Sequence, residues 1–203
     1  MSVRKLEART GGRGRKGHPG LGLLAGLIVI AWIVEFIDSY FGLGLDDRYG
    51  VYPRTFVGLR GVIFMPWLHS DWGHLLDNTI ALLGLGVIVI LAEGRRFAST
   101  TLILALITGL GTWAIADLGQ EKIQHIGASG LVYAYFGYIM ARAIWGRRLV
   151  WAVVGIVVAV VYGGMIGGVL PGGDRISWEA HLVSWEAHLV GLLGGVWLGQ
   201  RHA

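Results

Sequence analysis

The chain has 203 residues, of which 54% are hydrophobic, 15% are charged and 34 are glycine. This composition excludes an ordinary soluble domain and indicates a polytopic membrane protein. The absence of cysteine excludes disulfides and thiolate nucleophiles, and the net charge of +4 favours contact with anionic lipid rather than with nucleic acid.

Residues 1–19 are basic, rich in glycine and without apolar periodicity, so we expect a disordered cytoplasmic arm there and a membrane domain over residues 20–203. We do not expect a cleavable signal peptide. The apolar run after the arm is too long for the hydrophobic core of a signal peptide, and no small-residue cleavage pattern follows it.

Six apolar stretches approach the roughly 20 residues that a helix needs to cross a bilayer. They are Leu21–Phe41, His74–Ala92, Phe97–Asp117, Ser129–Ile144, Leu149–Leu170 and Trp178–Leu198. The sequence therefore predicts an all-α fold, a bundle of six transmembrane helices. The fourth stretch is short, which would sink its first turn, and Ser129 with it, below the membrane surface but within reach of water.

Positive charge sets the expected orientation, because Lys and Arg gather on the cytoplasmic side of membrane proteins. With the amino terminus inside, the inner segments hold most of the 17 Lys and Arg residues, including Arg95, Arg96, Arg147 and Arg148. We therefore expect both termini to be cytoplasmic and the fourth helix to begin on the outer side. A compact chain without a targeting peptide fits the bacterial inner membrane.

The outer segment between the first two predicted helices, residues 42–73, is too long for a plain connector. Its tryptophans suit a membrane interface, so we expect a partly embedded loop. The loop leads into His74 and Asn78, which share one face at the outer end of the second helix. Each could be an interfacial polar residue or a helix cap, but together they are candidate hydrogen-bond donors to a developing oxyanion.

The segment Gly127-Ala128-Ser129-Gly130 places the hydroxyl of Ser129 at the start of the fourth helix. Small residues in this spacing also let two membrane helices pack closely, which is the alternative interpretation. The sixth helix carries His188, followed by a glycine stripe that lets a neighbouring helix approach. The stripe consists of Gly191, Gly195 and Gly199. If the neighbour is the fourth helix, His188 meets Ser129 and can act as its general base.

These patterns, in this order and all at the outer ends of their helices, resemble the rhomboid family of intramembrane serine proteases. The likeness extends from Leu21 to Gln200. The matching residues are His69, His74, Asn78, Gly127, Ser129, Gly130, Tyr133, Ala187, His188, Gly191 and Gly195.

The resemblance implies that Ser129 is a nucleophile, that His188 is its base, and that Tyr133 stacks on the imidazole. It also implies an oxyanion hole made by the Ser129 backbone N–H with the His74 and Asn78 side chains. The implied substrates are single-pass membrane proteins, cut in or near their transmembrane segment, and no metal or organic cofactor is implied. A dyad agrees with the spacing of Glu186, which lies about 200° around the helix from the histidine and so cannot orient it.

The chain departs from the family pattern in two places. The first loop has Leu59-Arg60 where the family usually has Trp-Arg, and the sequence SWEAHLV occurs twice in succession, at residues 177–183 and 184–190. The repeat is a duplication, natural or introduced, and it offers two bases, because His181 and His188 would lie about 10 Å apart along the helix and about 20° apart around it. We favour His188, which keeps the family spacing to the glycine stripe. Counting residues from the inner arginines favours His181, the alternative base.

Two other classes of protein compete with a protease. If the duplication displaces the base, the chain would be a catalytically inactive relative that binds transmembrane segments. A transporter could use Glu35 and Asp38, which share one helix face, although an interfacial placement explains them more simply. We expect His69 and His125 to have loop or structural roles. The sequence makes no prediction about the oligomeric state.

Overall fold

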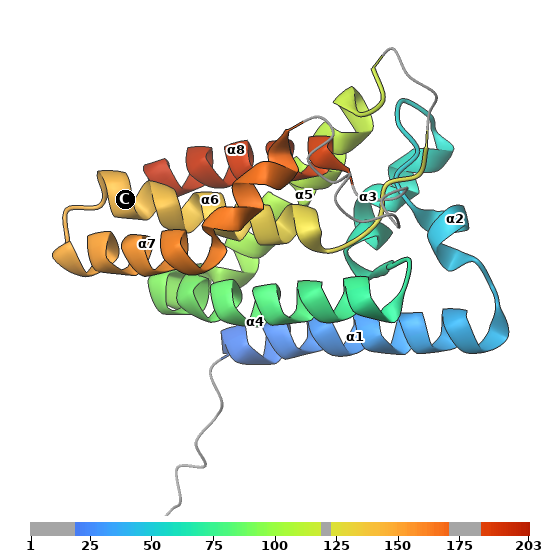
Figure 1. Cartoon of the computed structure of the whole chain (residues 1–203), viewed down its shortest axis with the longest axis horizontal. Coiled ribbons are helices and arrows are strands. Elements are labelled where there is room, and N and C mark those ends of the chain that lie inside the picture. Colours follow the sequence, from blue (N-terminus) through green and yellow to red (C-terminus); the bar gives the residue numbers. More distant parts are fainter. Residues whose placement is uncertain (1–18, 119–122, 171–183) are drawn as a thin grey trace, which may run out of the picture.

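Helices make up most of the residues that the computed structural model describes, which are 19–118, 123–170 and 184–203 (Figure 1). In this part of the chain there is no strand, only one antiparallel bridge between Val51 and His125. The all-helical fold expected from the apolar pattern is therefore confirmed. The long helices are α1 (Pro19–Phe41), α4 (Trp72–Glu93), α5 (Phe97–Ile115), α6 (Ser129–Trp145), α7 (Leu149–Tyr162) and α8 (Trp185–Arg201).

The helix ends differ from the predicted stretches where local chemistry starts or stops a helix. The helix expected from His74 begins two residues earlier, because the Asp71 carboxylate caps α4 by accepting a hydrogen bond from the His74 backbone N–H. The helix expected to reach Leu170 ends at Tyr162, where four glycines in seven residues favour the 3₁₀ segment η6 (Gly163–Val169).

The duplicated segment is described only in its second copy. Ser184 caps α8, its hydroxyl accepting a hydrogen bond from the Ala187 backbone N–H at 3.0 Å, so the helix begins at Trp185. The predicted start at Trp178 and the alternative base His181 lie outside the described residues. So do residues 1–18, which make up nearly all of the predicted arm.

The central helix of the bundle is α6, in which every residue from Gly130 to Ile139 is buried. Its closest neighbour is α8, and glycine makes that approach possible. A Cβ atom at Gly191 would lie 2.1 Å from the Gly130 carbonyl oxygen, and one at Gly195 would lie 2.0 Å from the Ala134 carbonyl oxygen. Any larger side chain at these two positions would push the helices apart.

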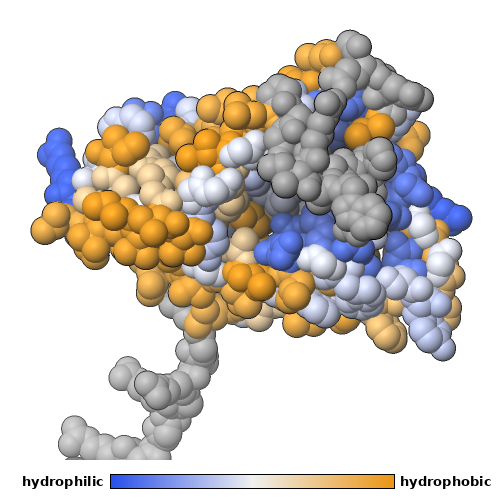
Figure 2. Space-filling view, in the orientation of Figure 1, coloured by the Kyte–Doolittle hydropathy of each residue, from blue (hydrophilic) through white to orange (hydrophobic). Residues whose placement is uncertain are grey.

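Three continuous helical segments among the described residues are long and apolar enough to cross a membrane. They are Pro19–Phe41, Trp72–Ile115, which joins α4 to α5 through the short turn η5 (Gly94–Arg96), and Leu149–Val169. Figure 2 shows apolar side chains spread over α7, whose residues are mostly exposed. The chain is thus built to contact lipid. The central α6 has 17 residues and is about 25 Å long, less than the hydrocarbon core of a bilayer.

The long loop between α1 and α4 is folded rather than extended. It contains α2 (Leu45–Tyr49), η3 (Val57–Arg60), α3 (Gly61–Phe64) and η4 (Met65–Trp67). Arg60 links two of these pieces, because its guanidinium lies 4.7 Å from the centre of the Tyr49 ring and donates a hydrogen bond to the Arg48 carbonyl. The departure at Leu59-Arg60 therefore leaves the loop with an arginine anchor.

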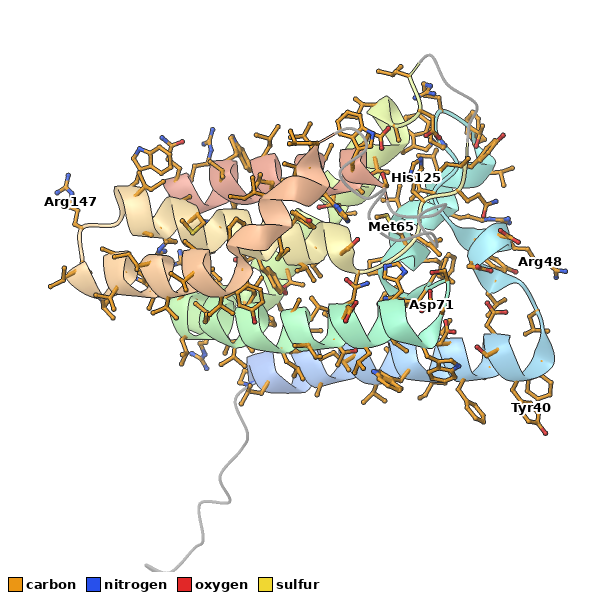
Figure 3. All side chains as sticks on the ribbon, viewed as in Figure 1. Tyr40, Arg48, Met65, Asp71, His125 and Arg147 are labelled. Carbon is orange, nitrogen blue, oxygen red and sulfur yellow. The ribbon has the colours of Figure 1, made fainter. Side chains whose placement is uncertain are left out.

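The loop between α1 and α4 holds the chain segment that leads into α6. Val51 exchanges two backbone hydrogen bonds of 2.9 Å with His125, and the Gly127 N–H donates to the Met65 carbonyl at 3.0 Å. Figure 3 shows Met65, Asp71 and His125 together at one end of the bundle and Arg147 at the other. The start of α1 and the C-terminus both lie toward the Arg147 end (Figure 1). We call these the loop end and the arginine end.

Candidate active site

Ser129 and His188 meet at the loop end, although 59 positions separate them in the sequence. Ser129 is the first residue of α6, and His188 lies in the first turn of α8. The Ser129 Oγ and His188 Nε2 atoms are 2.8 Å apart, a hydrogen-bond distance. The close approach of α6 and α8 at Gly191 brings the two side chains within reach.

The second ring nitrogen of His188 faces a backbone carbonyl. Nδ1 lies 2.9 Å from the carbonyl oxygen of Gly168, in η6. Because a carbonyl can only accept, the proton of the neutral imidazole is on Nδ1, and Nε2 is left to accept the Ser129 hydroxyl proton. Sequence reasoning missed Gly168. Nothing in the sequence could have indicated it, since every residue has a carbonyl.

Glu186 is turned away from the histidine, as its helical spacing predicts. One of its carboxylate oxygens accepts the Asp117 backbone N–H at 3.3 Å, and the other accepts the Ser184 hydroxyl at 3.3 Å. The histidine is therefore oriented by a carbonyl, where a serine-protease triad would have a carboxylate.

Tyr133 covers one face of the imidazole. The two rings are stacked, with centroids 4.1 Å apart and planes inclined by 13°. The tyrosine hydroxyl donates a hydrogen bond to the Met165 carbonyl in η6 at 2.7 Å. Contacts from α6 and η6 thus hold the His188 ring on both its face and its edge.

His74 and the Ser129 hydroxyl converge on Gly127. A Cβ atom at Gly127 would lie 2.9 Å from His74 Nε2 and 3.6 Å from Ser129 Oγ, and the residue has a φ of +102°. Both the backbone conformation and the crowding favour glycine there. The Ser129 N–H, at the start of α6, has no carbonyl partner in the helix ladder and adds a donor at the positive end of the helix.

Two residues before α4 orient His74. Asp71 Oδ1 accepts the His74 backbone N–H at 2.9 Å, and the Ser70 hydroxyl donates to Asp71 Oδ2 at 2.8 Å. The same hydroxyl lies 3.2 Å from His74 Nδ1, and when it donates there instead of to Asp71, the neutral ring carries its proton on Nε2, on the Gly127 side. Sequence reasoning did not single out Ser70 or Asp71, although a serine and an aspartate before an apolar run are a helix-start signal.

Asn78 and His69 are both buried next to Ala128, the residue before Ser129. Together with Ala128 they line a small cavity, and the Asn78 Nδ2 atom and both His69 ring nitrogens have no hydrogen-bond partner among the described residues. The His69 and His74 rings lie edge to face, with centroids 5.1 Å apart. Burial lowers the pKa of His69 to about 3, so this ring is neutral at physiological pH.

His125 has a structural position, as expected. It is buried, and its Nε2 atom lies 3.0 Å from Asp117 Oδ2, which also accepts the Ile123 backbone N–H at 2.9 Å. The pair ties the segment before Gly127 to the end of α5. Over the three described ranges, no three His, Asp or Glu side chains are arranged so that they could hold a metal ion.

Comparison with known proteins identifies the family of this chain. Uncharacterized proteins of Mycobacterium tuberculosis and Mycobacterium bovis are each 40% identical over 162 residues, which is 76% of this chain and 66% of theirs. The chain thus spans just under two thirds of the length of these relatives. A protein named rhomboid-type serine protease 2, from Debaryomyces hansenii, is 27% identical over 120 residues, which is 58% of this chain and 42% of the yeast protein.

The rhomboid domain profile matches residues 58–201, a range that includes Ser129, His188, His74 and Asn78. The match covers well over half of the chain, including most of η3, the rest of the loop before α4, and helices α4 to α8. The chain therefore belongs to the rhomboid family.

Proposed function

We propose that the chain is an intramembrane serine endopeptidase that cuts single-pass membrane proteins in or near their transmembrane segment. The observation that carries the proposal is the 2.8 Å contact between Ser129 Oγ and His188 Nε2, with the imidazole oriented by the Gly168 carbonyl. Family membership supports this reaction class, and no cofactor is needed for it.

In the first step, His188 Nε2 takes the hydroxyl proton as Ser129 Oγ attacks the scissile carbonyl carbon. The carbonyl oxygen becomes an oxyanion, for which the Ser129 N–H, His74 and Asn78 are the proposed donors. The imidazolium formed on His188 keeps its Nδ1 hydrogen bond to Gly168. It then gives the Nε2 proton to the leaving amine, and the peptide bond breaks.

In the second step, water attacks the acyl group on Ser129. His188 accepts a proton from this water and returns one to the serine oxygen, so that the free enzyme is restored. No charged group of the chain is needed to orient the base. A neutral carbonyl serves, at a lower electrostatic cost in a membrane than a buried carboxylate.

We propose that the chain crosses the membrane six times, through α1, α4, α5, α6, α7 with η6, and α8. Three long apolar segments, the 17-residue α6 and α8, and the position of both described chain ends at the arginine end support this topology. The arginine end would be cytoplasmic and the site would open outward, with the bacterial inner membrane as the proposed location.

The test is cleavage of a single-pass transmembrane substrate in proteoliposomes by the full chain and by Ser129→Ala. We expect the wild type to cut the substrate and the variant to lose at least about a thousandfold in kcat, because the nucleophile is gone. Unchanged cleavage by Ser129→Ala would refute the assignment. Binding of the substrate without cleavage by the wild type would favour the inactive relative that binds transmembrane segments.

A further inference from the structure

We infer that the Tyr133 hydroxyl is a positioning group for the histidine base, separate from the stacking of its ring. By holding η6 through the Met165 carbonyl, the hydroxyl keeps the Gly168 carbonyl on His188 Nδ1. The inference rests on the proposed function, in which His188 is the base.

Three contacts link α6, η6 and α8, so that each of these elements contacts the other two. The Tyr133 ring stacks on His188, the His188 Nδ1–H donates to Gly168, and the Tyr133 hydroxyl donates to Met165, three residues before Gly168. The two carbonyls belong to one short segment. Loss of the hydroxyl contact therefore loosens the segment that supplies the other.

Among the described residues, packing holds η6 only in part: Met165 packs against the hydrophobic core, and the glycines contribute no side chains. Val169 is its one buried residue, and Cβ atoms at Gly163, Gly164 and Gly167 would meet nothing within 4 Å. Packing therefore does not require glycine at those three positions. Glycine also loses the most conformational freedom on ordering, so each hydrogen bond that fixes this backbone matters more than it would in a regular helix.

The consequence for the base is a choice of tautomer. With Gly168 in place, the neutral imidazole carries its proton on Nδ1, and Nε2 is free to accept from Ser129. If η6 moves away, the proton can reside on Nε2 instead, and that tautomer cannot take the serine proton. The Tyr133 hydroxyl acts through Gly168 in this account and does not touch the reacting atoms.

The kinetic test compares Tyr133→Phe with Tyr135→Phe. Phenylalanine at position 133 keeps the stacked ring and removes the hydroxyl, and we expect kcat to fall about tenfold with KM unchanged. Tyr135 is the matched control, because its buried hydroxyl bonds Thr101 at 2.7 Å, on the same helix but away from His188. Its variant should lose stability and keep kcat. Full kcat in Tyr133→Phe, beside a wild type that cleaves, would overturn the inference and leave the proposed function standing.

A second test does not depend on cleavage. The chain has 7 histidines, and the His188→Gln variant assigns the His188 signals in ¹⁵N-imidazole spectra of the full chain in detergent. We expect the wild type to show the single tautomer protonated on Nδ1, Tyr133→Phe to show a mixture of tautomers, and Tyr135→Phe to match the wild type. A single unchanged tautomer in Tyr133→Phe would contradict the inference, even if no substrate is cut by any form.

Discussion

The two ends of the bundle both bury polar side chains, but they pair them differently. At the arginine end, the side chain of Glu93 is fully buried, and its carboxylate accepts hydrogen bonds from the Tyr138 and Thr100 hydroxyls. Arg142 and His202 lie 3.6 Å and 3.2 Å from its two oxygens. This one acid thus links α4, α5, α6 and the end of α8.

At the loop end, pairing is less complete than around Glu93, where Arg142 Nε alone lacks a partner among the described residues. Asn78 Nδ2 and both ring nitrogens of His69 have no partner among the described residues. A satisfied buried network adds stability, whereas an unpaired buried donor costs free energy and is retained where a reacting group will use it. The difference predicts that substitutions affect mainly stability at the arginine end and mainly activity at the loop end.

The largest expected effect is on the base. We expect His188→Ala to lower kcat by at least about a thousandfold, because Ser129 then has no proton acceptor. His181→Ala, in the other copy of the repeat, is the matched control and should keep most of the activity. Cleavage kinetics of the two variants measure the difference. The reverse pattern would show that His181 is the base and that the α8 register is wrong.

The next effect belongs to the arginine end. Glu93→Ala removes the acceptor shared by Tyr138 and Arg142, and we expect it to lower the free energy of unfolding by about 3 kcal/mol. The kcat of the folded fraction should stay within about twofold of wild type, since the site lies at the other end. Asp47 is exposed, so Asp47→Ala is the control for the loss of a carboxylate without loss of buried contacts. A stable Glu93→Ala with greatly reduced kcat would break the comparison between the ends.

A smaller effect on activity is expected at Asn78. Asn78→Ala removes one proposed oxyanion donor, and the loss in kcat should be about a hundredfold with little change in KM. Thr79→Val, one residue on, removes a hydroxyl that bonds the Leu75 carbonyl and serves as the control. Equal kcat in the two variants would remove Asn78 from the oxyanion hole.

The smallest effect concerns pH. His69 has a pKa of about 3 in the folded chain and about 6.5 when unfolded, so below pH 6.5 the unfolded chain binds the extra proton. Stability should therefore fall as the pH drops, by roughly 1 kcal/mol between about pH 7 and about pH 5.5. His69→Phe should flatten this dependence. Parallel curves of thermal midpoint against pH for the two proteins would contradict the burial of an unpaired His69.

The helical fold and the meeting of Ser129 with His188 could be predicted because both follow from pattern. Apolar runs set the helices, and the glycines at 191 and 195 determine which face of α8 touches α6. The starts of α4 and α8 could also be predicted from the sequence, since Asp71 and Ser184 are of residue types that favour a helix N-cap.

Other parts of the site could not be predicted, because they depend on backbone atoms or on a long loop. The Gly168 and Met165 carbonyls have no sequence signature, and their role appears only once the glycine-rich run after Tyr162 is seen to leave the α-helix. Likewise, the pairing of Val51 with His125 joins distant segments through main-chain groups. No periodicity in the loop sequence indicates that contact.

The most direct test of the central claim is to map a covalent adduct on the full chain. A fluorophosphonate reacts with a serine whose hydroxyl is activated by a neighbouring base. Peptide mass spectrometry should find the adduct on Ser129 in the wild type and in His181→Ala, and should find none in His188→Ala. A wild type without an adduct on Ser129, or an adduct that persists in His188→Ala, would contradict the dyad.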